Sequence, residues 1–181
     1  MRLFTAIDIS VEVRDELRKL LNRLRPLAKL KWSPVENMHI TTKFVGEWPE
    51  QRLEEMKRVL DTVVFPEAID IEVRGLGWFP NPKRPRVFWA GVRAGAALPA
   101  LAHETERAAA SLGVPVEDRP YAPHLTLARL KDPVALDALR SAIAGLETYS
   151  FGTFQANAFS LYLSAGGKYT RLAEFSRNQT C

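Results

Sequence analysis

The sequence has little of what disulfide-bonded proteins and metalloenzymes require. Cys181 is the only cysteine among 181 residues, so no disulfide can form within the chain, which fits a reducing cytoplasm. This cysteine is terminal and has no His-Asp context, which gives little support to thiol catalysis. The sequence also has no H-E-x-x-H motif and no cysteine cluster. We therefore expect a cytoplasmic protein without a dedicated zinc or magnesium site.

Long hydrophobic runs are missing as well. No apolar stretch approaches the ~20 residues that a membrane helix needs, and the N-terminal MRLFTAIDIS lacks the apolar region of a secretory signal. With 46% hydrophobic and 25% charged residues, the composition is typical of a globular protein. These features predict a soluble protein that does not span a membrane.

The charge that is present is moderately basic. The formal net charge is +4 at pH 7 and the sequence pI is about 9.4, which favours an anionic partner. The densest cluster is Lys83, Arg84 and Arg86 in NPKRPRVFW, where the prolines predict a loop before a strand. This loop either contacts phosphate or belongs to a solvated basic surface.

Hydrophobic periodicity predicts strands and helices in two similar halves. The first half reads as a strand at 3–8, a helix capped by Ser10, a strand over MHITTKFVG, a helix at 49–64, and strands at 69–76 and 86–92. The second half reads as a helix at 98–111, the strand HLTLARL, a helix opened by Asp132 and Pro133, and two strands, FQANAFSLYLS and YTRLAEFS, joined through Gly166 and Gly167. We infer an α+β protein with largely antiparallel sheets.

Two of the three histidines stand in the same H-x-T frame. His39 and Thr41 lie in MHITTKF, and His124 and Thr126 lie in PHLTLAR, each within a predicted strand. Ten residues are threonine, so two of three histidines would share this frame by chance with a probability of about 1%. Because side chains alternate along a strand, each histidine and its threonine project from one face. The third histidine, His103, has no such frame and is expected on an exposed helical face.

Two such pairs facing each other across a cleft can hydrolyse a phosphodiester without a metal. One imidazole takes a proton from water and the other gives a proton to the leaving oxygen, which suits a side chain with an unperturbed pKa of ~6.5. The threonine hydroxyls can donate hydrogen bonds to non-bridging phosphate oxygens. A single polar histidine in a strand is more often structural, so this hypothesis depends on the two motifs together.

In these residues the chain resembles the two-histidine phosphoesterase superfamily, and within it the RNA 2′,3′-cyclic phosphodiesterases, also called 2′-5′ RNA ligases. The resemblance extends over most of the chain through the blocks RLFTAID, KWSPVENMHITTKFVGE, PRVFWAGV, RPYAPHLTLAR and LYLSAGGKYTRLAEF, in the family's order. It implies a single bilobal α+β domain over residues 1–181, with pseudo-twofold symmetry and lobes that are not consecutive in sequence. Two largely antiparallel sheets would flank a central groove, with helices on the outside.

The resemblance also implies the reaction. Water would open a terminal 2′,3′-cyclic phosphate of RNA, break the bond to O3′ and leave a 2′-phosphate, without a metal or other cofactor. His39 would be the general acid and His124 the general base, while Thr41, Thr126 and Arg129 would hold the phosphate. The implied partner is an RNA end, and a monomer is expected.

Strict alternation conflicts with two of the implied roles. It places Arg129 on the face opposite His124, so a role for Arg129 requires a bulge or an early strand end. Phe44 is similar to a residue that contacts the terminal nucleoside, but alternation places it opposite His39, where the alternative is a core position. The same rule places Lys43 on the face of His39, where the chemistry is expected.

One position departs from the common form of the family. Ala122 stands immediately before Pro-His, where another arginine is often found. Either a contact to longer RNA is missing or Arg119 supplies it.

Other functions remain open at this stage. The same residues could join a 2′,3′-cyclic end to a 5′-hydroxyl, or hydrolyse another small cyclic phosphate. A non-catalytic module that binds RNA ends is a further alternative. The intact His and Thr pairs argue against such a module, because Arg and Lys would serve pure phosphate binding better.

Overall fold

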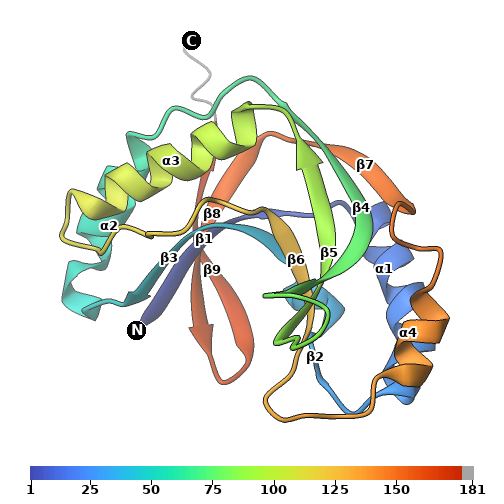
Figure 1. The fold of residues 1–181 in the computed structure, drawn as a ribbon. Coiled ribbons are helices and arrows are strands. Elements are labelled where there is room, and N and C mark those ends of the chain that lie inside the picture. Colours follow the sequence, from blue (N-terminus) through green and yellow to red (C-terminus); the bar gives the residue numbers. More distant parts are fainter. Residues whose placement is uncertain (177–181) are drawn as a thin grey trace.

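The computed structural model describes residues 1–176 and shows two antiparallel sheets with helices on their outer sides (Figure 1). This arrangement confirms the predicted α+β class. Within these residues the α-helices are α1 (Val11–Leu24), α2 (Leu53–Asp61), α3 (Ala97–Ala110) and α4 (Asp137–Ile143). None of the described helices is long and apolar enough to cross a membrane. Cys181 lies outside the described residues.

The first sheet contains the first H-x-T motif. Its strand order is β3-β1-β8-β9, and each neighbouring pair is antiparallel. The strands are β1 (Arg2–Asp8), β3 (His39–Glu47), β8 (Ala158–Ala165) and β9 (Lys168–Ser176). Gly166 and Gly167, with φ of 57° and 77°, form the tight β8–β9 connection that the sequence predicts.

The second sheet contains the second H-x-T motif. Its order is β2-β6-β5-β4-β7, again with antiparallel neighbours. The strands are β2 (Lys31–Trp32), β4 (Ile69–Phe79), β5 (Val87–Ala94), β6 (His124–Arg129) and β7 (Ser150–Ala156). Each sheet is therefore assembled from segments that are not consecutive in the sequence, and each receives one motif strand.

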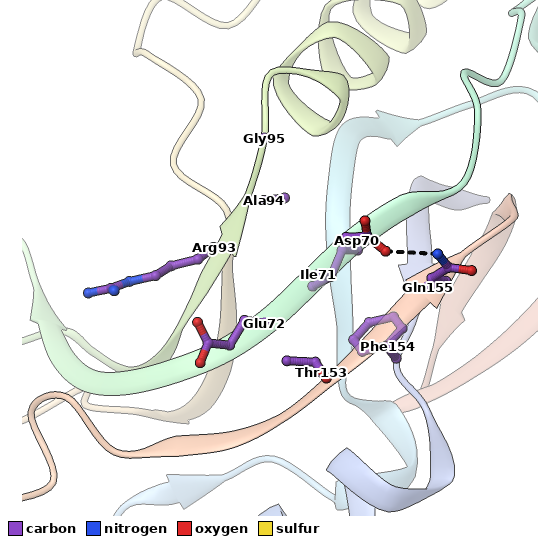
Figure 2. Close-up of a pocket in the computed structure, with 9 residues that line it drawn as sticks. All are labelled: Asp70, Ile71, Glu72, Arg93, Ala94, Gly95, Thr153, Phe154 and Gln155. Carbon is purple, nitrogen blue, oxygen red and sulfur yellow. Dashed lines mark hydrogen bonds between the residues drawn. The ribbon is translucent and has the colours of Figure 1, made fainter.

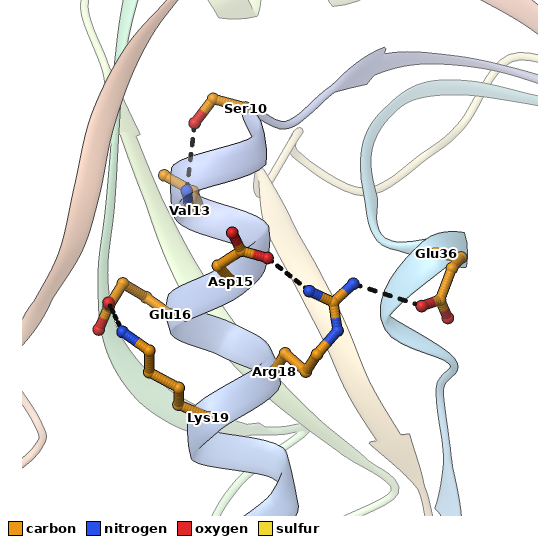
Figure 3. A network of polar contacts seen from close by, with 7 residues as sticks. All are labelled: Ser10, Val13, Asp15, Glu16, Arg18, Lys19 and Glu36. Carbon is orange, nitrogen blue, oxygen red and sulfur yellow. Dashed lines mark hydrogen bonds and ion pairs between the residues drawn. The ribbon is translucent and has the colours of Figure 1, made fainter.

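Helix α1 shows how local sequence and packing combine on the outside of the second sheet. As predicted, Ser10 caps the helix, and its hydroxyl accepts a hydrogen bond from the Val13 N–H at 3.2 Å (Figure 3). The buried stripe consists of Val13, Leu17, Leu20, Leu21 and Leu24. On the exposed side Arg18 bridges Asp15 and Glu36 (Figure 3). Such exposed pairs contribute about 0.3–0.5 kcal/mol each, so the buried stripe is what holds α1 beside β7.

Helix α3 covers the other end of the molecule. It packs on β3 and on α2, so it backs the strand that carries the first motif (Figure 1). The predicted helix at 49–64 is shorter in the structure, where a 3-10 turn at Glu50–Arg52 precedes α2.

The predicted helix at Asp132 and Pro133 is wrong in its position. Helix α4 begins only at Asp137, and the preceding residues are irregular. Val134 and Leu136 pack against the hydrophobic core in this irregular segment. Their burial outweighs the helix-start signal of the proline.

The predicted strand FQANAFSLYLS is also wrong, because it is two strands in different sheets. Strand β7 ends at Ala156 in the second sheet, and β8 begins at Ala158 in the first. Apolar residues stand on both sides of Asn157, and burial in either sheet produces the same pattern. A change of sheet was therefore not visible in the periodicity.

Candidate active site

The two H-x-T strands come from different sheets and lie side by side at the centre of the molecule (Figure 1). The Tyr121 hydroxyl, in the segment that leads into β6, donates a hydrogen bond to the Thr41 carbonyl in β3 at 2.9 Å. Burial raises the pKa of Tyr121, so the hydroxyl stays protonated and able to donate. The fold thus brings the first and second motifs next to each other.

His39 is half-buried among aromatic rings at the start of β3. Phe4 stacks on the imidazole with ring centroids 4.7 Å apart, Tyr169 meets it edge-on at 5.0 Å, and Tyr162 lies at 5.8 Å. Burial lowers the pKa of His39 to about 4, although a backbone hydrogen bond and the charge of Asp8 act in the opposite direction. This environment by itself keeps His39 neutral at pH 7.

His124, at the start of β6, has a more polar environment. Its Nδ1 lies 2.7 Å from the Ala122 carbonyl, which can only accept, so in the neutral ring Nδ1 carries the proton and Nε2 has a free lone pair. Phe79 contacts the imidazole edge-on, with centroids 5.0 Å apart. Burial lowers the pKa of His124, the bond to Ala122 opposes this, and the charge of Arg129 lowers the pKa further. A neutral imidazole with a free Nε2 is the form that a general base requires.

A β-bulge interrupts the alternation in β3. In the pairing with β1, Thr5 lies opposite Lys43 and Ala6 lies opposite Thr41, so Thr42 has no partner of its own in the ladder. The Thr42 hydroxyl is instead bonded to the buried Thr5 hydroxyl at 2.6 Å. This bond satisfies the Thr42 hydroxyl, which is buried on the same side of the strand as Ile40.

The bulge reverses the two faces of β3 that alternation predicts. Lys43, expected beside His39, is buried, with 7% of its surface exposed. Phe44, for which a core position was the alternative, is 60% exposed. Its ring lies 6.3 Å from Phe4, the ring that stacks on His39. Both corrections have one cause, because the extra residue at Thr42 shifts the side chains of Lys43 and Phe44 to the other face.

Strand β6 has a bulge at the equivalent place. In the pairing with β5, Thr126 and Ala128 lie opposite consecutive residues, so Leu127 is left without a partner. Leu127 and Ala128 are both buried, whereas Arg129 is exposed. The bulge therefore returns Arg129 to the face of His124, which is the condition that its predicted role requires.

Lys43 connects the first motif strand to the segment that leads into the second. Its ammonium group pairs with Glu106 of α3 and donates to the Pro115 carbonyl at 2.7 Å. Glu106 also accepts a hydrogen bond from the Glu117 N–H at 2.9 Å. Burial alone would raise the pKa of Glu106, but the hydrogen bonds from Lys43 and Glu117 outweigh it and lower the pKa. The pair therefore helps to hold the two motif strands together.

Asp8 is a candidate site residue that the sequence reasoning missed. It lies opposite His39 in the β1–β3 pairing, and its carboxylate accepts hydrogen bonds from the Tyr162 hydroxyl and the Arg171 guanidinium. Burial and the bond to Asp8 raise the pKa of Tyr162. An acidic residue at the end of a largely apolar strand, RLFTAID, was the signal available in the sequence.

Two other predicted positions can be placed. Arg119, the suggested substitute for the arginine missing at Ala122, has a side chain that is 89% exposed, and its Nε lies 3.4 Å from the Glu117 carboxylate. Its ion-pair partner within residues 1–176 thus belongs to its own segment. His103 is exposed on α3, as the sequence predicts.

A hollow of about 540 Å³ on the second sheet contains none of the predicted site residues (Figure 2). It is lined by β4, β5 and β7, and a hydrogen bond of 2.9 Å from Gln155 to Asp70 lies on one side (Figure 2). Arg93 lines it two residues beyond Gly91, which pairs with His124. The hollow therefore lies along β5 from the candidate site and is not the site itself.

The groups that the two motif strands carry on the faces of their histidines are suited to a phosphate. They are two imidazoles, the half-buried hydroxyls of Thr41 and Thr126, and the guanidinium of Arg129. Hydroxyls and guanidinium donate hydrogen bonds to anions, while imidazoles transfer protons near neutral pH. Among residues 1–176, no three His, Cys, Asp or Glu side chains are grouped as a metal ion would require. The metal-free reaction stays a prediction.

Comparison with known proteins gives matches over nearly the whole chain. The family described as LigT like Phosphoesterase matches residues 7–89 and 92–169. A protein of Methanothermobacter thermautotrophicus named RNA 2′,3′-cyclic phosphodiesterase is 33% identical over 181 residues, covering 97% of this chain and 98% of that protein. A protein of the same name from Archaeoglobus fulgidus is 34% identical, covering 89% of each chain.

Solved structures have the same fold. A crystal structure from Thermus thermophilus superimposes with a TM-score of 0.80 at 30% identity and covers 100% of both chains. The crystal structure of E. coli LigT complexed with 3′-AMP has a TM-score of 0.76 at 24% identity and covers 98% of each chain.

Proposed function

This chain belongs to the LigT-like phosphoesterase family, and we propose that it hydrolyses the 2′,3′-cyclic phosphate at the end of an RNA strand to a 2′-phosphate. One observation carries the proposal: two H-x-T strands from different sheets lie side by side, with His39 and His124 in unlike environments. The name shared by relatives that cover most of the chain supports it.

In the proposed reaction His124 is the general base. Its Nε2 takes a proton from water, the water oxygen forms a bond to phosphorus, and the bond from phosphorus to O3′ breaks. His39 gives its proton to O3′ as this oxygen leaves. One proton is taken up and one is given out, so the chain needs no metal to balance the reaction.

The other residues of the site bind the anion and its nucleoside. Thr41 and Thr126 donate hydrogen bonds to the non-bridging oxygens, and Arg129 supplies a positive charge. The bound phosphate raises the pKa of His39 from about 4, because a nearby anion favours the imidazolium that the general acid must be. The exposed ring of Phe44 offers a flat apolar surface to the terminal nucleoside.

The whole bilobal domain is the unit of function in this proposal. Neither sheet contains both motifs, so neither can assemble the acid-base pair without the other. We infer a monomer that acts in the cytoplasm. A chain with a single cysteine forms no internal disulfide, which fits this reducing compartment.

The test uses a short oligoribonucleotide with a 2′,3′-cyclic phosphate end, incubated with the purified protein in EDTA. The expected product is the 2′-phosphate alone, resolved chromatographically from the 3′-phosphate. His39→Ala and His124→Ala should each reduce the rate by at least about 10²-fold. His103→Ala, on the exposed face of α3, is the matched control and should retain the wild-type rate.

Two outcomes would contradict the proposal. Unchanged rates in folded His39→Ala and His124→Ala would show that these histidines are not the acid-base pair. Loss of wild-type activity in EDTA would show that the reaction requires a metal ion. Tight binding without cleavage would favour a module that binds RNA ends, and a longer product in the presence of 5′-hydroxyl RNA would favour ligation.

A further inference from the structure

A small basic hollow adjoins the candidate site at Arg129. It has a volume of about 190 Å³, and its lining includes Lys29, Lys31, Arg129 and Lys131 together with the carboxylate residue Asp132. Lys29, Lys31 and Lys131, which the proposed reaction does not use, are called the lysine pocket below. All three lysines are exposed, so a ligand can reach them from solvent.

Strand pairing gives the lysine pocket its position relative to the site. Lys31 in β2 lies directly opposite Arg129 in β6, and directly opposite residues project from the same face of a sheet. The β6 bulge puts Arg129 on the face of His124. Lys31 is therefore on the face of the candidate active site, next to the residue proposed to hold the reacting phosphate.

Within residues 1–176 the cations of this hollow have no acidic partners, unlike four of the cations on the helices. Arg18, Lys19, Lys57 and Arg107 all pair with carboxylates three residues away. In contrast, within residues 1–176 no ion pair involves a lysine-pocket residue or Arg129. Four cations near one exposed carboxylate leave a local excess of positive charge that attracts an anion.

The basic loop that the sequence singled out lies beside this hollow. The Arg86 guanidinium donates to the Lys131 carbonyl at 2.8 Å, and the Leu130 N–H donates to the Arg86 carbonyl at 2.9 Å. Within the loop the Asn81 side chain accepts hydrogen bonds from the backbone N–H groups of Lys83 and Arg84, each at 3.0 Å. The loop is thus held in place and extends the positive surface away from Arg129.

We propose that the lysine pocket binds the backbone phosphate on the 5′ side of the terminal nucleotide. This inference rests on the proposed function and deepens it, because it defines the substrate as an RNA strand and not a free nucleotide. Lysines contact phosphate as point charges and do not read bases, so the preference is for a chain of any sequence. A mononucleotide 2′,3′-cyclic phosphate has no such phosphate and cannot use the pocket.

The experiment compares three substrates, of which two dinucleotides differ only in the charge of the linkage. They are a mononucleotide 2′,3′-cyclic phosphate, a dinucleotide ending in the cyclic phosphate, and the same dinucleotide with an uncharged methylphosphonate linkage. For the wild type, kcat/KM should be about tenfold higher for the charged dinucleotide than for either of the others, mainly through KM.

The variant combines Lys29→Gln, Lys31→Gln and Lys131→Gln, and it should lose this tenfold advantage. Its kcat/KM on the mononucleotide should stay within about twofold of the wild type, and its melting temperature reports that it is folded. The matched control combines Lys19→Gln, Lys57→Gln and Arg107→Gln, which removes the same net charge from helices α1, α2 and α3. The control should keep the full preference for the charged linkage.

Several results would overturn the lysine pocket. One is an equal loss of the preference for the charged linkage in the two triple variants. Another is a lysine variant whose kcat/KM falls equally on the mononucleotide and the dinucleotide. A third is a wild type with the same kcat/KM for the charged and the uncharged linkage. Absence of cleavage for all substrates would instead overturn the proposed function itself. Salt dependence gives an independent readout: with a 2′-phosphate-ended dinucleotide, the slope of log Kd against log salt should be shallower in the lysine variant, because one phosphate contact is lost.

Discussion

The two motif strands, β3 and β6, have the same backbone arrangement, but their histidines have different neighbours. Each begins at its histidine, has a bulge three residues later, and returns the fifth residue after the histidine to the histidine's face. That residue is Phe44 in β3 and Arg129 in β6. Aromatic rings enclose His39, whereas a backbone carbonyl holds His124 and a guanidinium lies near it. The repeated backbone positions two imidazoles, and unlike neighbours give them unlike proton affinities.

The largest expected effect is on the rate, and it distinguishes the proposed general acid His39 in β3 from the proposed general base His124 in β6. On an RNA 2′,3′-cyclic phosphate, His39→Ala and His124→Ala should each lower kcat by about 10³-fold. With a nitrophenyl phosphodiester, whose leaving group needs no proton, His39→Ala should recover most of its activity and His124→Ala should not. Steady-state rates on both substrates measure this, and equal recovery of the two variants would show that the roles are not divided in this way.

The next effect is on stability and concerns the residue that follows each bulge. This residue is the buried, charged Lys43 in β3 and the buried, apolar Ala128 in β6. Glu106→Gln removes the charge that pairs with the buried Lys43 and should lower the free energy of unfolding by about 2 kcal/mol, less than for a fully buried pair because Glu106 is partly exposed. Urea denaturation measures it. The control is Glu104→Gln, which breaks the exposed pair with Arg107 on the same helix and should cost below about 0.5 kcal/mol.

The pH dependence of the unfolding free energy tests the same ion pair in a second way. Because the folded pKa of Glu106 is lowered, its contribution is present above the ordinary value of 4.5 and is lost as the pH falls through the lowered value. Glu106→Gln should therefore reduce the loss of stability on acidification. A steeper loss in the variant would argue against the ion pair.

A smaller effect concerns Phe44, the residue that the bulge in β3 exposes. Phe44→Ala should raise KM for a dinucleotide by about tenfold with little change in kcat, since stacking on an aromatic side chain contributes about 1–3 kcal/mol per base. Phe44→Trp keeps an aromatic surface and should retain the wild-type KM. A fall in kcat with unchanged KM in Phe44→Ala would mean that Phe44 positions His39 and does not contact the nucleoside.

The smallest effect is a shift in the pH profile. Since burial lowers the pKa of His39 to about 4, the limb of kcat/KM that reports His39 should lie below pH 6.5, and the corresponding limb of kcat should lie higher because the bound anion raises this pKa. Asp8→Asn removes a charge that raises the pKa of His39, so it should move the kcat/KM limb to lower pH. A shift to higher pH would contradict the assignment of this limb to His39.

Prediction from the sequence succeeded where the signal is local. The Ser10 cap, the apolar stripe of α1 and the glycine turn between β8 and β9 each involve residues within a few positions of one another. Prediction failed at Asp132, where tertiary burial of Val134 and Leu136 delays the helix, and at Asn157, where the chain changes sheets. In both places distant contacts outweigh a local pattern.

The sequence by itself determined the two H-x-T frames and the family to which the chain belongs, because these depend on which residues occur and in what order. Tertiary structure decided the faces of Phe44 and Arg129, because a bulge is set by the pairing of a strand with its neighbour. It also decided that Asp8 lies opposite His39 and that Lys31 lies opposite Arg129. Such neighbours are far apart in the chain, and pairing between distant strands is the physical step that brings their charges together.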